Sequence, residues 1–143
     1  IAHGQHYQSQ IDPTSGRVYR LRAKAKPLVA DTNLSAKTDE QLIGLLAHPN
    51  KWHRQTAVRL LGHRATAVTN AKLRKQIKAE TGRAALHGLW ALHQAGGLDD
   101  ALAAELLWHS YPHVRAWAVR LRGDERKLSA GFWARWKLAI SRR

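Results

Sequence analysis

The chain has 143 residues, of which 24 are Lys or Arg and only 10 are Asp or Glu, and its formal charge of +14 predicts attraction to polyanions or to an acidic partner. A hydrophobic fraction of 44% with six Trp indicates a folded domain and excludes a disordered chain. The absence of cysteine excludes disulfides, zinc–thiolate sites, iron–sulfur clusters and CxxCH haem attachment within the chain.

Residues 1–34 differ from the rest of the chain. Turn-forming residues at 11–16 precede a stretch at 17–22 whose Val and Tyr favour a short β-strand, and a linker follows. We therefore predict an extended or strand-like arm at 1–34 and a helical domain at 35–143. Because the first residue is Ile1 and not Met, we expect the chain to be a fragment of a longer protein.

Helical patterns fill the second region. The first helix is expected from Thr38, where Thr-x-x-Gln forms a capping box, and it ends before Pro49. Asn50, Asp99 and Ser129 are suited to cap later helices. The further helices are expected at about 51–63, 69–80, 83–94, 100–108, 113–122 and 130–141.

One helical motif is written more than once. The segment 54–62 recurs at 115–123, which is 61 residues later, and a weaker copy starts at Arg83. A spacing of about 30 residues is typical of one helical hairpin per repeat. We predict an all-α solenoid of about three hairpins, closed by a capping helix at 130–141. This helix is expected to have a basic outer face and an aromatic inner face made of Phe132, Trp133, Trp136 and Ile140.

The repeated motif resembles a HEAT repeat. It shows a polar residue, Pro, and then Arg-x-x-Ala, as in Pro49, Arg54 and Ala57, and the fit is better at Val114 and Arg115. This resemblance implies a stack of HEAT-like hairpins.

A narrower resemblance covers nearly the whole chain. Ile-Asp-Pro-Thr-x-Gly-Arg-Val-Tyr-Arg-Leu at 11–21 is similar to the closing strand of a β-propeller in Planctomycete-type membrane-bound dehydrogenases related to sugar dehydrogenases. The helical segments that follow, including Leu-Trp-Ala-Leu-His at 89–93, resemble the HEAT segment that joins such propellers to a c-type cytochrome domain. The resemblance implies an exported, periplasmic parent, and it transfers no catalytic or haem residue to this chain.

Basic residues are the candidate binding residues. Arg54, Arg83 and Arg115 share one position of the motif and either grip phosphates or tie one repeat to the next through carbonyls or an acid; we favour the structural role. Arg59, Arg120 and the helix with Lys72, Lys75 and Lys78 are better suited to a free basic surface. The candidate surface for a polyanion or a partner therefore comprises Arg54, Arg59, Lys72, Lys75, Lys78, Arg115 and Arg120.

The sequence contains no motif for catalysis, metal binding or cofactor binding. Nine His are present without HExxH or a carboxylate–His cluster, and most acids fall at expected helix starts, where capping explains them. The six Trp are expected mostly in the core or between repeats, and Trp52, early in its helix, is the one expected to be exposed. We predict a non-enzyme without cofactor or metal.

Two functions remain open from the sequence. The first is a scaffold or interaction module that contacts a protein partner or the neighbouring domains of a larger redox protein. The second is a nucleic-acid-binding HEAT domain, with DNA glycosylases of HEAT type as its enzymatic extreme. No apolar run approaches the roughly 20 residues that a membrane-spanning helix needs.

Overall fold

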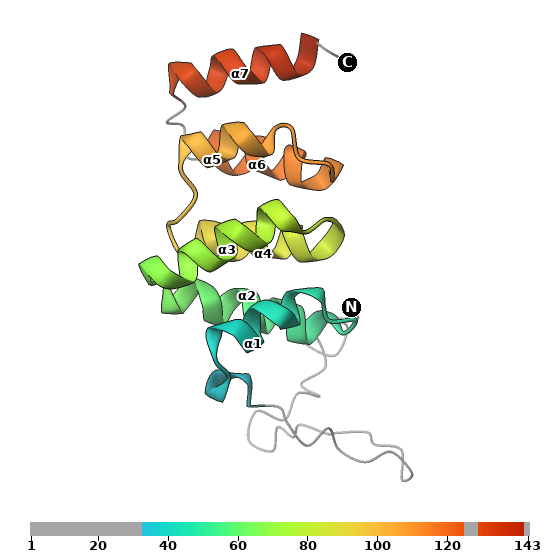
Figure 1. Ribbon diagram of the computed structural model, residues 1–143, viewed down its shortest axis with the longest axis vertical. Coiled ribbons are helices and arrows are strands. Elements are labelled where there is room, and N and C mark those ends of the chain that lie inside the picture. Colours follow the sequence, from blue (N-terminus) through green and yellow to red (C-terminus); the bar gives the residue numbers. More distant parts are fainter. Residues whose placement is uncertain (1–32, 125–128, 142–143) are drawn as a thin grey trace, which may run out of the picture. The chain divides into compact units, whose positions relative to one another are not determined.

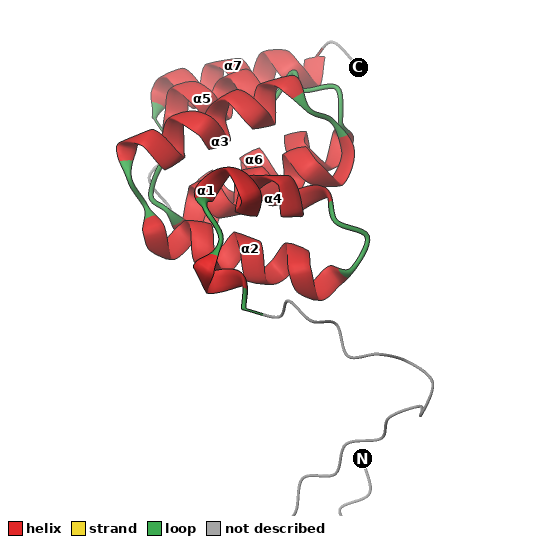
Figure 2. Cartoon of the chain, turned by 60° about the horizontal axis from the view of Figure 1, so that its bottom comes forward, coloured by secondary structure: helices red, strands yellow, loops and turns green. Residues whose placement is uncertain are grey.

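The computed structural model describes residues 33–124 and 129–141. The chain divides into a unit of Ile1–Ala30 and a unit of Asp31–Arg143. The predicted strand at 17–22 and the propeller-like segment at 11–21 lie outside the described residues. In the described part of the second unit, every regular element is helical (Figure 2).

The predicted helices are present with small shifts of their ends. The α-helices are α1 (Asp39–Gly44), α2 (Lys51–Arg64), α3 (Ala67–Ala79), α4 (Gly82–Gln94), α5 (Asp100–Leu106), α6 (Pro112–Asp124) and α7 (Ala130–Ser141). Short 3-10 helices, η2 (Leu34–Ala36) and η3 (Leu45–Ala47), flank α1. No helix in 33–124 or 129–141 is long and apolar enough to cross a membrane.

The helix starts follow the capping residues. Thr38 Oγ1 accepts the Gln41 N–H at 3.3 Å, and Gln41 Oε1 accepts the Thr38 N–H at 2.9 Å, which completes the predicted capping box. Asn50 accepts from the Trp52 N–H at 2.9 Å, and Asp99 accepts from the Leu102 N–H at 2.8 Å. Each bond satisfies a backbone donor that the first helical turn leaves unpaired.

Glycine and proline set two further helix boundaries. After α4, Gly96 has a φ of +68°, which an L side chain rarely adopts. The Gly97 N–H then donates to the Leu92 carbonyl at 2.9 Å, in a Schellman motif. Pro112 is the first residue of α6 and not a break before it, because a proline at this position lacks only an N–H that the helix would leave unpaired.

Successive helices pack in pairs. Contacts join α1 to α2, α3 to α4, and α5 to α6, and further contacts run from α2 to α4, from α4 to α6, and from α5 to α7. Figure 1 shows these pairs as successive layers. Buried Leu, Ala and Val side chains from α1 to α6 form one core cluster, which Phe132 of α7 joins.

Charged side chains fasten the start of one helix to the end of another. Arg64, at the end of α2, donates to the Lys37 carbonyl at 2.6 Å and to Asp39 at 3.3 Å. Arg122, near the end of α6, donates to Asp100 at 2.7 Å and to the Leu98 carbonyl at 3.4 Å. These contacts join the end of α2 to the start of α1, and the end of α6 to the start of α5.

The last helix differs from the predicted cap. Phe132 is buried and Trp136 is half-buried, but Trp133 and Ile140, which we expected on the same inner face, are exposed. The reason is that α7 packs mainly on α5, while its flank with Trp136 and Ile140 borders a groove shared with α6. The helix therefore presents an apolar surface where a polar cap was expected.

Candidate interaction groove

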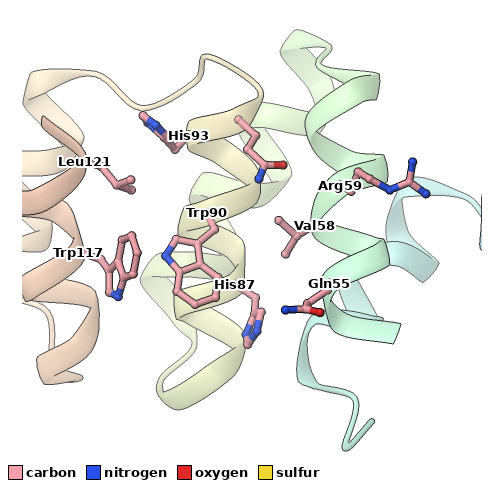
Figure 3. Close-up of a pocket in the computed structure, with 9 residues that line it drawn as sticks. Gln55, Val58, Arg59, His87, Trp90, His93, Trp117 and Leu121 are labelled. Atoms are coloured by element: carbon pink, nitrogen blue, oxygen red, sulfur yellow. The ribbon is translucent and has the colours of Figure 1, made fainter. Parts of the chain in front are cut away.

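A groove of about 460 Å³ crosses α2, α4 and α6 (Figure 3). Its lining is mainly apolar and aromatic, with a polar or basic rim and no carboxylate. The nine lining residues are Gln55, Val58 and Arg59 from α2, His87, Trp90, His93 and Gln94 from α4, and Trp117 and Leu121 from α6.

Two tryptophans form the aromatic centre of the groove. The rings of Trp90 and Trp117 meet edge to face, with centroids 5.0 Å apart and an interplanar angle of 74°. The Trp90 Nε1–H is buried and has no hydrogen-bond acceptor among the described residues. Figure 3 shows this nitrogen on the side of Trp90 that faces Trp117. The pair therefore gives the groove a preformed aromatic wall.

His87 brings a polar but uncharged group to this wall. It is buried, its ring lies 5.0 Å from that of Trp90, and its Nδ1 lies 2.6 Å from the Arg83 carbonyl, to which it donates. Burial lowers the pKa of His87 below its ordinary value, and the charges of Arg54 and Arg83 add to this effect. At neutral pH the imidazole is therefore neutral.

Positive charge lies beside the aromatic wall. Arg59 belongs to the groove lining, is exposed, and has no ion-pair partner among residues 33–124 and 129–141; Figure 3 shows its guanidinium at the outer edge, pointing away from the two tryptophans. Arg120 covers the ring of Trp117 with its guanidinium carbon 4.8 Å from the centroid, and its one ion pair among the described residues is a long one of 3.8 Å with Asp124. Both cations remain accessible to an anionic group.

Two of the candidate arginines are structural. Arg54 is only 7% exposed and donates to the His48 and Pro49 carbonyls at 2.6 and 2.7 Å. Arg115 donates to the His109 and Ser110 carbonyls at 2.7 and 3.0 Å. Both therefore bind the turn before their own helix, and not the next repeat as we expected.

Arg83 does not share this position. It is the second residue of α4 and is exposed, whereas Arg54 and Arg115 are each the fourth residue of their helix. The weaker copy of the motif is therefore out of register, and the three arginines do not occupy one position of their helices.

The lysines of α3 point away from the groove lining. Lys72 pairs with Glu40 of α1, holding the pKa of Glu40 down at about 2 by hydrogen bonding and charge, and Lys78 pairs with Glu105 of α5 at 2.6 Å. Lys75 is exposed, without an ion pair among the described residues. Of the seven candidates, only Arg59 and Arg120 lie at the groove.

The tryptophans are less buried than we expected. Trp52 is 47% exposed, as predicted, but Trp108 is 53% exposed and Trp133 is also exposed. Trp90, Trp117 and Trp136 are half-buried at the edge of the core, so none of the six lies fully inside. Large rings at helix surfaces are suited to contact a ligand or another helix.

Sequence reasoning missed most of the groove. Within each helix the lining residues include pairs spaced three or four residues apart, such as Gln55 and Val58 or Trp117 and Leu121. That spacing could have placed them on a common face. It could not tell an open face from a buried one. The described residues contain no group of three His, Asp or Glu side chains that could hold a metal ion. No family model, curated protein or solved structure matches the chain.

Proposed function

We propose that this chain is a non-enzymatic, HEAT-like interaction module that binds an extended segment of a protein partner in the α2–α4–α6 groove. The observation that carries the proposal is the groove itself: an apolar wall with Arg120 over Trp117, Arg59 at its outer edge, and no carboxylate in its lining. An apolar or aromatic side chain of the segment fits the wall, and a neighbouring Asp or Glu fits the cations.

The repeat architecture of this proposal is supported by two turns with the same hydrogen bonds. His48 Nδ1 accepts the Asn50 N–H at 3.0 Å, and His109 Nδ1 accepts the Tyr111 N–H at 3.0 Å. Arg54 and Arg115 bind the carbonyls of these two turns. Both pairs recur after 61 residues, which is what two repeats of about 30 residues predict. The solenoid interpretation rests on this register.

The role of the module within a larger protein rests on the sequence resemblance. A HEAT segment between a propeller and a cytochrome domain would place these domains and present a surface to a partner. We propose on that basis that the chain is part of an exported, dehydrogenase-like redox protein. Its own residues supply binding and spacing, because the groove lining contains no Ser, Cys, Asp or Glu with which His87 or His93 could form a catalytic pair.

Nucleic acid is the second candidate ligand. Arg59 and Lys75 are exposed without ion pairs among the described residues, and Arg120 lies over the ring of Trp117, which joins a cation to an aromatic ring as a single-stranded nucleic acid would require. Against it, Arg54, Arg115, Lys72 and Lys78 are engaged within the protein, which reduces the phosphate-binding surface that the sequence suggested.

A peptide selection tests the proposal. Random peptides displayed on phage are selected on the full chain at about 150 mM salt, where long-range charge attraction is screened. Enriched peptides are measured by fluorescence anisotropy against the wild type and against Trp117→Ala, Arg59→Glu and the matched surface control Lys75→Glu. We expect acidic peptides with an aromatic or branched apolar residue, weakened about tenfold or more by the two groove variants and unaffected by the control.

The same assay separates the two ligands. Labelled duplex and single-stranded DNA are titrated at low and near-physiological salt. Binding that collapses as salt rises is nonspecific phosphate attraction and leaves the peptide proposal in place. DNA binding that survives and requires Trp117, together with peptides that ignore both groove variants, would replace the protein partner with nucleic acid.

A further inference from the structure

A second groove lies between α6 and α7, away from the first one. It also measures about 460 Å³, and its lining includes Ala116 and Val119 from α6 and Trp136, Ala139 and Ile140 from α7. Ile140 is 55% exposed, and the exposed ring of Trp133 lies edge to face with Trp136, 4.9 Å away. An apolar helix flank of this kind is normally covered in a folded protein.

The repeat register indicates what covers it. Gln55, Val58 and Gly62 in α2 recur after 61 residues as Ala116, Val119 and Gly123 in α6. The three residues of α2 lie on the flank that faces α4: Val58 is buried, and a Cβ at Gly62 would lie 2.8 Å from the Cβ of Gln94 in α4. That flank of α2 therefore receives a helix at close range.

The same flank of α6 receives nothing in the described chain. A Cβ at Gly123 would meet no atom within 4 Å, Ala116 is exposed, and Val119 is half-buried. On the other side of the groove, α7 packs on α5, and its Trp136, Ala139 and Ile140 line the groove. The groove thus stands where the α2–α4–α6 layer would continue.

The charges around the second groove indicate the chemistry of a helix that would bind there. Arg135 and Lys137 flank Trp136 on α7, which has no acidic residue, and Arg120 is exposed on α6. Asp124 is the one acid in α6 and α7. A second copy of this chain would bring the basic α7 against another basic α7, and the two would repel each other.

We propose that the α6–α7 groove binds an acidic amphipathic helix of a protein partner, which packs against Ala116, Val119, Trp136 and Ile140 and extends the α2–α4–α6 layer by one helix. The proposal rests on the repeat register argued above, and it does not depend on a ligand in the first groove. The apolar side of the partner covers the groove, and its Glu and Asp side chains lie beside Arg135 and Lys137.

The test uses a designed 18-residue peptide with Leu on one face and Glu on the flanks, and a scrambled peptide of the same composition without that face. Both are labelled and titrated against the full chain by fluorescence anisotropy. We expect the amphipathic peptide to bind about tenfold or more tightly than the scrambled one, with its helicity rising on binding.

Three variants locate the site. Ala116→Glu places a like charge in the groove at an exposed helical position, and Gly123→Ala adds a methyl group where a partner helix approaches. Both are expected to keep the circular dichroism spectrum and to weaken the peptide, Ala116→Glu by about tenfold. Arg59→Ala in the first groove is the matched control and should leave the affinity for this peptide unchanged. The control separates a failure of the α6–α7 proposal from a failure of the proposal for the first groove.

Several results would overturn the proposal. Equal binding of the scrambled peptide would leave only charge attraction, and unchanged affinity in Ala116→Glu would place the peptide elsewhere. Sedimentation that shows a dimer of the free chain, dissociated by Ala116→Glu, would assign the groove to a second copy. Binding to vesicles of phosphatidylserine and phosphatidylcholine that requires Trp133, without a preference between the peptides, would assign the face to a membrane surface.

Discussion

An N–H of the Arg54 guanidinium donates to the backbone carbonyl of His48, with nitrogen and oxygen 2.6 Å apart, so a side chain of α2 closes the turn from which α2 begins. Arg54, which the sequence suggests as a candidate phosphate-binding residue, is thus engaged in a hydrogen bond within the protein. Arg115 repeats the arrangement on the His109 carbonyl.

Removing this contact should destabilise the protein without removing a binding residue. Arg54→Ala leaves the His48 and Pro49 carbonyls without the charged donor that the nearly buried Arg54 supplies, and we expect a loss of about 2–3 kcal/mol in the free energy of unfolding. Chemical denaturation followed by circular dichroism measures it. Arg59→Ala, five residues along the same helix but exposed, should stay within about 0.5 kcal/mol of wild type. Equal losses in both variants would contradict the structural role of Arg54.

Two glycines at equivalent positions should respond in opposite ways to alanine. Gly62→Ala forces a methyl group against the Cβ of Gln94, and overpacking of this kind costs about 1–3 kcal/mol. Gly123→Ala meets open space and gains up to about 1 kcal/mol from helix propensity. Thermal melts of the two variants give the sign of each change. A stabilised Gly62→Ala would mean that α2 and α4 do not approach as closely as described.

Mild acid should weaken the fold through His87. Its pKa is lowered in the folded protein, chiefly by burial, so the unfolded chain takes up this proton at a higher pH than the folded protein does. The free energy of unfolding should therefore fall as the pH drops below about 6.5, the ordinary pKa of His. In His87→Gln, the part of the pH dependence of the unfolding free energy that comes from His87 should vanish. Parallel pH profiles for the two proteins would show that His87 is not the titrating group.

Stronger acid should loosen the start of α5. Hydrogen bonding from Arg74 lowers the pKa of Asp99, and hydrogen bonding from Ser129 and then Arg122 lowers that of Asp100. A carboxylate with a lowered pKa stabilises the fold above its unfolded pKa, and this stability is lost as the pH falls through the folded pKa.

The Asp100 carboxylate can be tested by substitution at neutral pH. Asp100→Asn keeps the shape of the side chain but removes the charge that Arg122, a half-buried cation, meets at 2.7 Å. We expect a loss of about 1–3 kcal/mol, measured by urea denaturation. Glu80→Gln, a change of the same type at an exposed residue without an ion pair among the described residues, is the control for charge alone. An equal effect of both changes would assign the loss to net charge.

Local sequence signals were enough to predict the helices. Capping residues such as Thr38, Asn50 and Asp99, and the glycines that end α4, act within one or two turns of the backbone, so their effect can be predicted without knowledge of the tertiary structure. The spacing of Arg54 and Arg115 likewise predicted a repeated environment, since equivalent helices make equivalent turns.

Tertiary packing alone decided which of these residues are available to a ligand. Exposure depends on the helices that lie beside a given face, and the sequence of one helix does not record its neighbours. Arg54 and Arg59 have the same charge on the same helix, yet only Arg59 lines the groove, because the turn before α2 folds back onto Arg54. In the same way, Gly62 and Gly123 belong to one motif, but only Gly62 has a helix packed against it.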